Sequence, residues 1–171
     1  MTDFLELALR RYTCRKYSPQ PVEQDLLDKL LEAGRIAPSA KNCQPWHIWV
    51  LRSEEALAKV RKLTASTYGA PLVLAIGFDA AQGWVRASDG KNKAEMDSII
   101  QATHIMLEAE DLGLGCTWIG SYEPTELYAA FPEMAGYEVQ VLLAIGHRAP
   151  DAHPGPWHPL RKSLEEIVSE L

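Results

Sequence analysis

Apolar residues along the chain follow two patterns, helical spacing and short continuous runs. Spacings of three and four residues predict helices over residues 4–11, 23–34, 54–63, 94–112, 123–131 and 164–171. Continuous apolar runs predict buried strands over residues 46–51, 71–78, 116–119 and 138–147. Because helices separate the strands and several connections are long and irregular, the pattern predicts a layered α+β domain.

Two segments lack either pattern. Residues 79–93 are polar apart from Trp84 and Val85, which predicts a loop or a mobile excursion from the domain. Four prolines between residues 150 and 159 predict an extended arm before the last helix, because proline cannot continue a helix. An arm of this kind is suited to lie across a partner chain.

Chain length, charge and cysteine usage narrow the class of protein. The 171 residues predict one domain over 1–171, large enough to bury roughly 70% of its unfolded surface. The 17 basic and 23 acidic residues give a net charge of −6, which argues against broad binding to nucleic acid or anionic membranes. No apolar run approaches the roughly 20 residues of a membrane span, and we expect no signal peptide. The widely spaced Cys14, Cys43 and Cys116 predict reduced thiols and a cytoplasmic location.

A basic cluster follows the first helix. It consists of Arg10, Arg11, Thr13, Arg15 and Lys16. Guanidinium groups pair bidentately with phosphate oxygens, so two of them beside a hydroxyl suit a phosphate monoester. A solvated basic face is the alternative, although a local basic cluster is less easily accidental in an acidic chain. Cys14 lies inside the cluster, where neighbouring cations would lower the pKa of its thiol.

A second cluster of special residues, APSAKNCQPW, covers residues 37–46. Pro38 ends the preceding helix, and Ser39 is a predicted N-cap for a short following turn. The side-chain amides of Asn42 and Gln44 carry donors and acceptors together, as the mixed edge of a flavin or a nucleobase requires. An ordinary polar turn between a helix and a strand is the alternative.

A third cluster surrounds the short strand at 116–119. Gly115 and Gly120 bracket this strand, and a glycine at a strand end lets a ligand approach the backbone closely. A tight turn explains the same glycines without a ligand.

The other chemistry-bearing residues form no recognisable set. His147, His153 and His158 have no spacing typical of metal ligands, so we expect no metal site. Three acidic residues are interpreted as a solvated helix end: Glu108, Glu110 and Asp111. The sequence carries no dinucleotide-binding, P-loop or nucleophile-elbow motif, so a nicotinamide would have no dedicated Rossmann site.

Together these segments resemble the nitroreductase family of FMN-dependent oxidoreductases over nearly the whole chain. RRYTCRKYS is similar to the family's Arg-x-Ser-x-Arg phosphate motif, with Thr13 in place of serine. APSAKNCQPW is similar to the P-S-x-x-N-x-Q-P-W block, the most specific match. MDSIIQATHIMLEAEDLGLGCTWIGSY resembles the central helix and flavin-edge strand, and PLRKSLEEIV the C-terminal element, with Ser163 where proline is common. The chain lacks the long helical excursion of larger members, in whose place WVRASDGK stands.

The resemblance implies a fold and an assembly. The implied fold is a three-layer α+β domain whose central sheet, mixed but mostly antiparallel, is flanked by helices. The implied assembly is a homodimer that exchanges its C-terminal arms and binds FMN at the subunit interface. The FMN-binding residues that follow from the motifs are Arg11, Tyr12, Thr13, Arg15, Pro38, Ser39, Ala40, Asn42, Gln44, Trp118, Ile119, Gly120, Ser121 and Arg161.

The resemblance also assigns parts of the flavin to these residues. The cluster at 11–15 would hold the phosphate with support from Arg161, and residues 118–121 would lie along the isoalloxazine. Residues 38–42 would reach the same flavin from the other subunit. The candidates for contact with the flavin N1–C2=O edge are Arg86, Lys91 and Lys93.

The implied activity is that of an FMN-dependent oxidoreductase. Hydride would pass from NAD(P)H through flavin N5 to a nitroaromatic, quinone or similar acceptor in a ping-pong cycle. No side chain is expected to be catalytic, because the flavin carries the chemistry. Two alternatives are a specialised flavin reaction on the same fold, such as dehalogenation or flavin fragmentation, and a flavin-binding protein without turnover.

Overall fold

The structure is a computed structural model and describes residues 3–171. Its α-helices are α1 (Phe4–Arg10), α2 (Gln24–Arg35), α3 (Glu54–Leu63), α4 (Ala94–Asp111), α5 (Pro124–Ala130) and α6 (Leu164–Ile167). Its strands are β1 (Trp46–Leu51), β2 (Leu72–Phe78), β3 (Gly115–Ile119) and β4 (Glu138–Gly146). Short 3₁₀ turns cover Ala40–Asn42, Ala65–Thr67, Ala80–Gln82 and Pro132–Met134.

The four strands form one sheet in the order β1-β2-β4-β3. Every pair of neighbouring strands is antiparallel. At the outer edge of β3, Thr13 forms an isolated parallel bridge with Cys116, which brings the chain after α1 beside the sheet. The predicted α+β class and the mostly antiparallel sheet are therefore confirmed.

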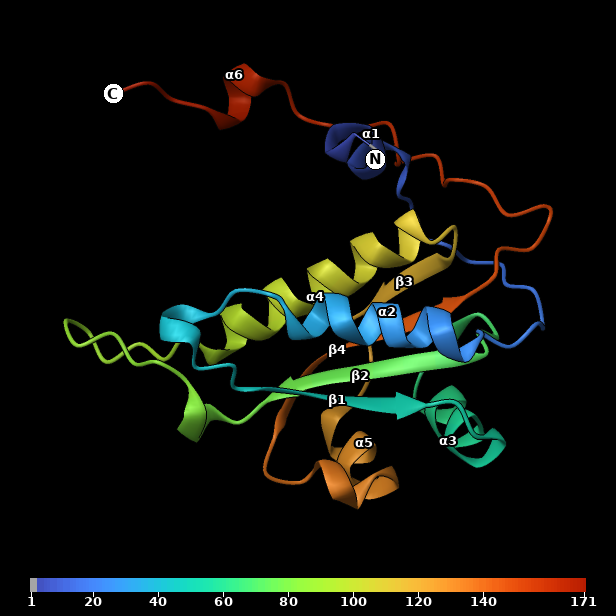
Figure 1. Ribbon diagram of the computed structural model, residues 1–171, viewed down its shortest axis with the longest axis horizontal. Helices are drawn as coiled ribbons and strands as arrows, with labels where there is room; N and C mark the ends of the chain where they lie inside the picture. Colours follow the sequence, from blue (N-terminus) through green and yellow to red (C-terminus); the bar gives the residue numbers. More distant parts are fainter. Residues whose placement is uncertain (1–2) are drawn as a thin grey trace.

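Helices cover both faces of this sheet (Figure 1). α2 and α4 pack on one face, over Leu72, Leu74 and Ile76 of β2. α3 and α5 pack on the other face, where Val73 and Ala75 of the same strand point. Because β2 is buried on both faces, its side chains show no apolar–polar alternation, and this explains the continuous run that predicted it.

The helix boundaries follow local signals. Asp3 caps α1 by accepting hydrogen bonds from the amides of Leu5 and Glu6, at 2.9 and 3.2 Å. α4 ends before Gly113, whose φ of +77° is the left-handed conformation that favours glycine. The predicted last helix is shorter than expected and stops at Ile167 rather than residue 171. It buries no residue, and a helix without a packed face is hard to extend in water.

The polar segment 79–93 is an ordered excursion that projects from the sheet layer (Figure 1). Val85 bridges Asn92, and the Lys93 amide donates to the Trp84 carbonyl at 2.9 Å. Arg86 forms an ion pair with Asp89 inside the same turn. Arg86, a candidate for the flavin edge, is thus already paired with a carboxylate of its own loop.

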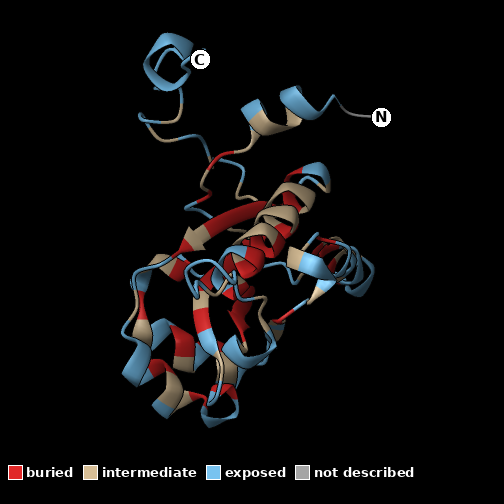
Figure 2. Cartoon of the chain, turned by 90° about the vertical axis from the view of Figure 1, so that its left-hand side faces the viewer, coloured by how far each residue is buried: buried red, intermediate tan, exposed pale blue. Residues whose placement is uncertain are grey.

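Both ends of the described chain lie away from the packed layers (Figure 2). α1 and the segment after residue 150 are largely exposed, and they carry large apolar side chains at Phe4, Leu5, Leu9, Trp157, Leu160 and Leu164. Among residues 3–171, no helix has the length and apolar character needed to cross a membrane.

Candidate functional site

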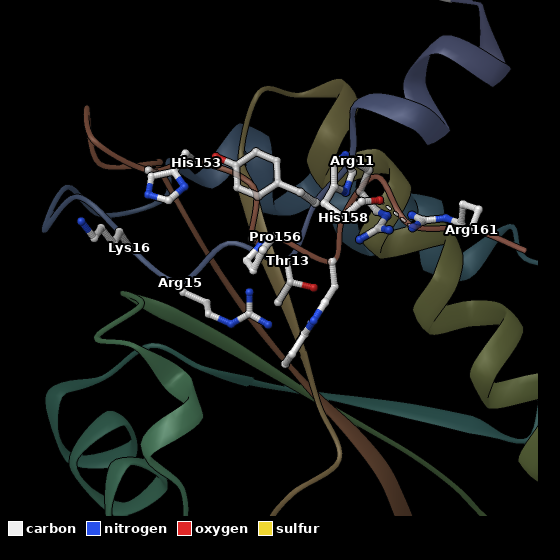
Figure 3. A pocket seen from close by; sticks show the side chains of 12 residues that line it. Arg11, Thr13, Arg15, Lys16, His153, Pro156, His158 and Arg161 are labelled. Carbon is white, nitrogen blue, oxygen red and sulfur yellow. Dashed lines mark hydrogen bonds between the residues drawn. The ribbon is translucent and has the colours of Figure 1, made fainter.

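A cavity of about 630 Å³ lies between the segment after α1 and the Pro-rich tail. Its wall is formed by Arg11, Tyr12, Thr13, Arg15, Lys16, Ala152, His153, Gly155, Pro156, Trp157, His158 and Arg161. In Figure 3, Thr13 and Arg15 lie at the centre, with Arg11, His158 and Arg161 on one side and Lys16 and His153 on the other. Two segments about 140 residues apart in sequence therefore build one site.

The first segment is extended because it follows the edge of the sheet. The amide of Cys14 donates to the Cys116 carbonyl at 3.1 Å, next to the parallel bridge from Thr13. Side chains of an extended chain alternate in direction. Cys14 accordingly points into the core with no exposed surface, while Thr13 and Arg15 stay outside and line the cavity.

Backbone bonds hold the tail beside this segment. The amide of Ser18 donates to the His147 carbonyl at 2.8 Å, and the amide of Ala149 donates to the Lys16 carbonyl at 3.1 Å. Further along, Arg161 Nη1 donates to the carbonyl of His158 at 2.6 Å. This contact folds the tail back, so that Arg161 shares the cavity with Arg11, Thr13 and Arg15, as the family resemblance implies.

The cavity is strongly cationic. Arg11, Arg15, Lys16 and Arg161 line it, and no aspartate or glutamate of the part of the chain that the structure describes does. Within residues 3–171, one of these four side chains forms an ion pair with a carboxylate: Lys16 pairs with the exposed Asp151. Forked guanidinium donors beside a hydroxyl, without a competing carboxylate, suit a doubly charged phosphate monoester.

A buried ion-pair network lies behind one wall. Glu110 is only 2% exposed, and its carboxylate accepts from Arg10 Nε at 2.8 Å and from Arg148 Nη2. The Arg148 guanidinium lies 5.0 Å from the centre of the Tyr12 ring, a cation–π contact. The interpretation of Glu110 as part of a solvated helix end is wrong, because two arginines draw it into the interior. Arg10 belongs to this network and does not line the cavity.

The pKa of one cysteine thiol, that of Cys14, differs from the expectation. Burial raises the pKa of the Cys14 thiol above its ordinary value, more than the nearby Arg148 lowers it. The expected low pKa is therefore wrong: the side chain points away from the cationic cavity. Burial raises the pKa of Cys116 to about 12. All three cysteines are free thiols in the structure.

The two glycines around β3 have different surroundings. A Cβ on Gly115 would lie 2.6 Å from Cys14 Sγ, so this glycine allows close packing of the chain and does not open space for a ligand. A Cβ on Gly120 would meet no heavy atom within 4 Å. Gly120 and Ser121 are exposed, Trp118 is half-buried, and the Ile119 side chain is 2% exposed in the core. Ile119 can therefore offer a ligand only its backbone.

The segment from Pro38 to Gln44 lies outside the cavity wall. The Ala40 amide donates to Asp97 Oδ1 of α4 at 3.0 Å. Lys41, Asn42 and Gln44 have positive φ angles of 49°, 57° and 49°, a conformation that costs non-glycine residues about 1–3 kcal/mol each. Ser39 does not cap the following turn, since its Oγ accepts from the Gln44 amide at 3.0 Å. The result is a hydrogen-bonded segment that presents Asn42 and Gln44 to solvent.

Sequence reasoning missed two cavity histidines. His153 and His158 share the cavity, whereas His147 lies apart and pairs with Glu23 at 2.8 Å. The sequence signal that could have found them is the Pro-rich tail. Both histidines stand beside the prolines of this tail, which lies against the basic segment. Among residues 3–171, no group of three or more His, Cys, Asp or Glu side chains is arranged to hold a metal ion.

Comparisons with known proteins agree with this architecture. The sequence model of the nitroreductase family matches residues 8–68 and 64–147. A candidate NADH dehydrogenase/NAD(P)H nitroreductase of Archaeoglobus fulgidus is 32% identical over 149 residues, which cover 84% of this chain and 82% of the relative. A nitroreductase family protein of Clostridium difficile 630 is 34% identical, with a TM-score of 0.91 over 98% of each chain.

A third protein, from Exiguobacterium sibiricum 255-15, was crystallised in complex with FMN. It is 24% identical and shares the fold, with a TM-score of 0.85 over 100% of this chain and 98% of its own. The family match spans both the basic segment after α1 and the block at 37–46, and the structural match spans the tail as well. On these grounds the chain belongs to the nitroreductase family.

Proposed function

We propose that this protein is an FMN-dependent NAD(P)H oxidoreductase and that its cationic cavity holds the phosphate of FMN. The observation that carries the proposal is the cavity wall, in which Arg11, Arg15 and Arg161 converge without a carboxylate. Membership of the nitroreductase family supports the activity, and the FMN bound to the Exiguobacterium sibiricum relative supports the cofactor.

When bound, FMN supplies the hydride-transfer chemistry. The chain's own residues bind and orient it. Arg15 and Arg161 would hold the phosphate from two different segments, and the Thr13 hydroxyl would donate one further hydrogen bond to it. Trp118, Gly120 and Ser121 follow at the end of β3, where the open space at Gly120 lets a flat ring approach the backbone.

We further infer that residues 1–171 form one domain and that two copies complete the site. The segment from Pro38 to Gln44 exposes Pro38, Lys41, Asn42 and Gln44, yet it lines no part of its own cavity. The apolar side chains of α1 and the tail are exposed in one chain and would be covered by a second. In such a dimer Asn42 would reach the partner's flavin, and the exchanged tails would cover α1. The free thiols fit a cytoplasmic location.

Flavin titration tests the phosphate site. Arg15→Ala should weaken FMN binding about 30-fold, since charge-assisted bonds contribute roughly 2 kcal/mol each. Riboflavin lacks the phosphate, so its affinity should be the same for both proteins. Lys62→Ala, an exposed change on α3, is the control for the loss of one positive charge. Equal loss of riboflavin and FMN affinity would contradict the assignment of Arg15.

Anaerobic reduction separates the candidate activities. We expect NADH or NADPH to bleach the bound flavin, and nitroaromatics or quinones to restore its colour without oxygen. Bound flavin that neither donor bleaches would favour a binding protein without turnover. Bleaching followed by loss of halide from a halogenated acceptor, or by breakdown of the flavin, would favour the specialised reactions.

A further inference from the structure

His158 occupies a place in the cavity that its sequence context did not reveal. It lines the same wall as Arg11 and Arg161, and Figure 3 shows these three side chains on one side of the cavity. It is half-buried, in a tail segment that is otherwise largely exposed. An imidazole among guanidinium groups can donate a hydrogen bond to an anion that they bind.

One aromatic contact of the ring and one backbone hydrogen bond position His158. Its ring meets the edge of the Tyr12 ring at a centroid distance of 6.3 Å and an angle of 71°. Behind Tyr12 lies Arg148, itself fixed by the buried Glu110. The backbone is held as well, since the His158 amide donates to the Gly155 carbonyl at 3.0 Å. The imidazole therefore has a defined position relative to the cavity.

The charges around His158 are almost all positive. From its own tail it faces Arg161 and the second histidine, His153. From the segment after α1 it faces Arg11, Arg15, Lys16 and the phenol of Tyr12. No aspartate or glutamate of residues 3–171 lines the cavity with it; Asp151 pairs with Lys16, and Glu110 pairs with Arg10 and Arg148. An anion bound in the cavity would favour a positive charge on the imidazole.

We propose that His158 is a phosphate-binding residue of this cavity and takes up a proton when a phosphate monoester binds. This inference rests on the proposed FMN site and adds a residue to it. Imidazole ordinarily titrates near pH 6.5, so binding can shift its charge at about neutral pH. Because binding takes up a proton, the contribution of His158 to affinity grows as pH falls and vanishes as pH rises.

The phosphate has a second ionisation of its own near pH 6, which lowers affinity in acid. This effect is common to every variant and cancels when the wild type is compared with His158→Gln at the same pH. Glutamine keeps a hydrogen-bond donor and removes the titratable charge. We expect the wild type to bind FMN about tenfold more tightly than His158→Gln at pH 6.0 and equally at pH 8.5.

A second variant separates charge from packing. His158→Arg carries a permanent positive charge, so it should keep an advantage of about tenfold over His158→Gln at both pH values. Riboflavin, which lacks the phosphate, should bind all three proteins with equal affinity at each pH. His47→Gln changes an exposed histidine of β1, outside the cavity wall, and should match the wild type throughout.

The outcomes distinguish this inference from the proposed function. The ratio of the FMN affinity of the wild type to that of His158→Gln is expected to differ between pH 6.0 and 8.5. If this ratio is the same at both pH values, the role of His158 is overturned while the FMN site stays intact. The same ratio of affinities can be measured for riboflavin. If it changes with pH as much as the ratio for FMN does, the role of His158 is overturned too. Failure of the wild-type protein to bind FMN at either pH would overturn the proposed function itself.

Discussion

Arg10 donates from Nε to Oε1 of Glu110 at 2.8 Å, across a hundred positions of sequence. The other oxygen of Glu110 accepts from Arg148, which follows β4. One buried carboxylate thereby joins α1, the end of α4 and the chain that leads into the tail. Since Arg148 also supports Tyr12, this network connects the interior of the molecule to the wall of the cavity.

Replacing this carboxylate should cost stability. Glu110→Gln leaves Arg148 partly buried without its counter-charge, and loss of one partner from a buried pair costs about 3 kcal/mol. Urea unfolding of the flavin-free protein, at one fixed protein concentration, measures this change. Asp111→Asn removes a charge from the next, exposed position and should change stability by less than about 0.5 kcal/mol. Equal effects of the two substitutions would show that the network contributes nothing.

The sequence predicted the layers of this fold because they depend on local patterns. β2 is apolar at every position, and that alone indicates a strand covered on both faces. Glu110 could not be predicted, since its neighbours in sequence are acidic and its partners lie in distant segments. The final helix was overestimated because its apolar spacing continues beyond Ile167 although no core lies beneath it.

The candidate site likewise contains residues that the sequence indicated and residues that it did not. Arg11, Thr13 and Arg15 stand in one short motif, and Arg161, which the resemblance groups with them, lines the same cavity. His158 was missed because its role depends on how the prolines fold the tail, which spacing does not encode. The proposed contribution of residues 38–42 to a partner's site depends on an assembly that one chain does not contain.

Asp97 should control the order of the segment at 38–44. The Ala40 amide bonds to its buried Oδ1, whereas Oδ2 has no hydrogen-bond partner within the described residues. Asp97→Ala should therefore speed hydrogen exchange of the Ala40 amide at least tenfold, because positions 41, 42 and 44 are strained and would relax. Asp97→Asn keeps an acceptor at Oδ1 and should retain most of the protection. Unchanged exchange in the alanine variant would contradict an anchoring role.

Gly115 and Gly120 should respond differently to the same substitution. In Gly115→Ala the new methyl group would lie 2.6 Å from Cys14 Sγ and 2.7 Å from Cys14 Cβ, and overpacking of this kind costs about 1–3 kcal/mol. Gly120→Ala meets open space and should leave the stability of the flavin-free protein unchanged. Under the proposed function, Gly120→Ala weakens flavin binding instead. Thermal unfolding and flavin titration of both variants measure the two effects separately.

The cysteines should differ in reactivity toward a thiol reagent at pH 8. Cys14 and Cys116 are buried, and burial raises the pKa of both thiols, that of Cys116 to about 12. Because the thiolate is the nucleophile, a thiol with a pKa near 12 is ionised at pH 8 in only about one molecule in ten thousand. Cys43 is half-buried and should be modified first, with Cys14 and Cys116 reacting at the rate of unfolding.

Counting modified thiols with a chromogenic disulfide reagent provides the measurement. We expect one fast-reacting thiol per native chain and three after denaturation, and Cys43→Ser should abolish the fast phase. Raising the pH from 8 to 9 increases the thiolate fraction of every cysteine, but the two buried thiols should stay slow because access also limits them. A fast phase that survives in Cys43→Ser would mean that Cys14 is accessible beside the cationic cavity. The reactive thiol expected there from the basic sequence around Cys14 would then be real.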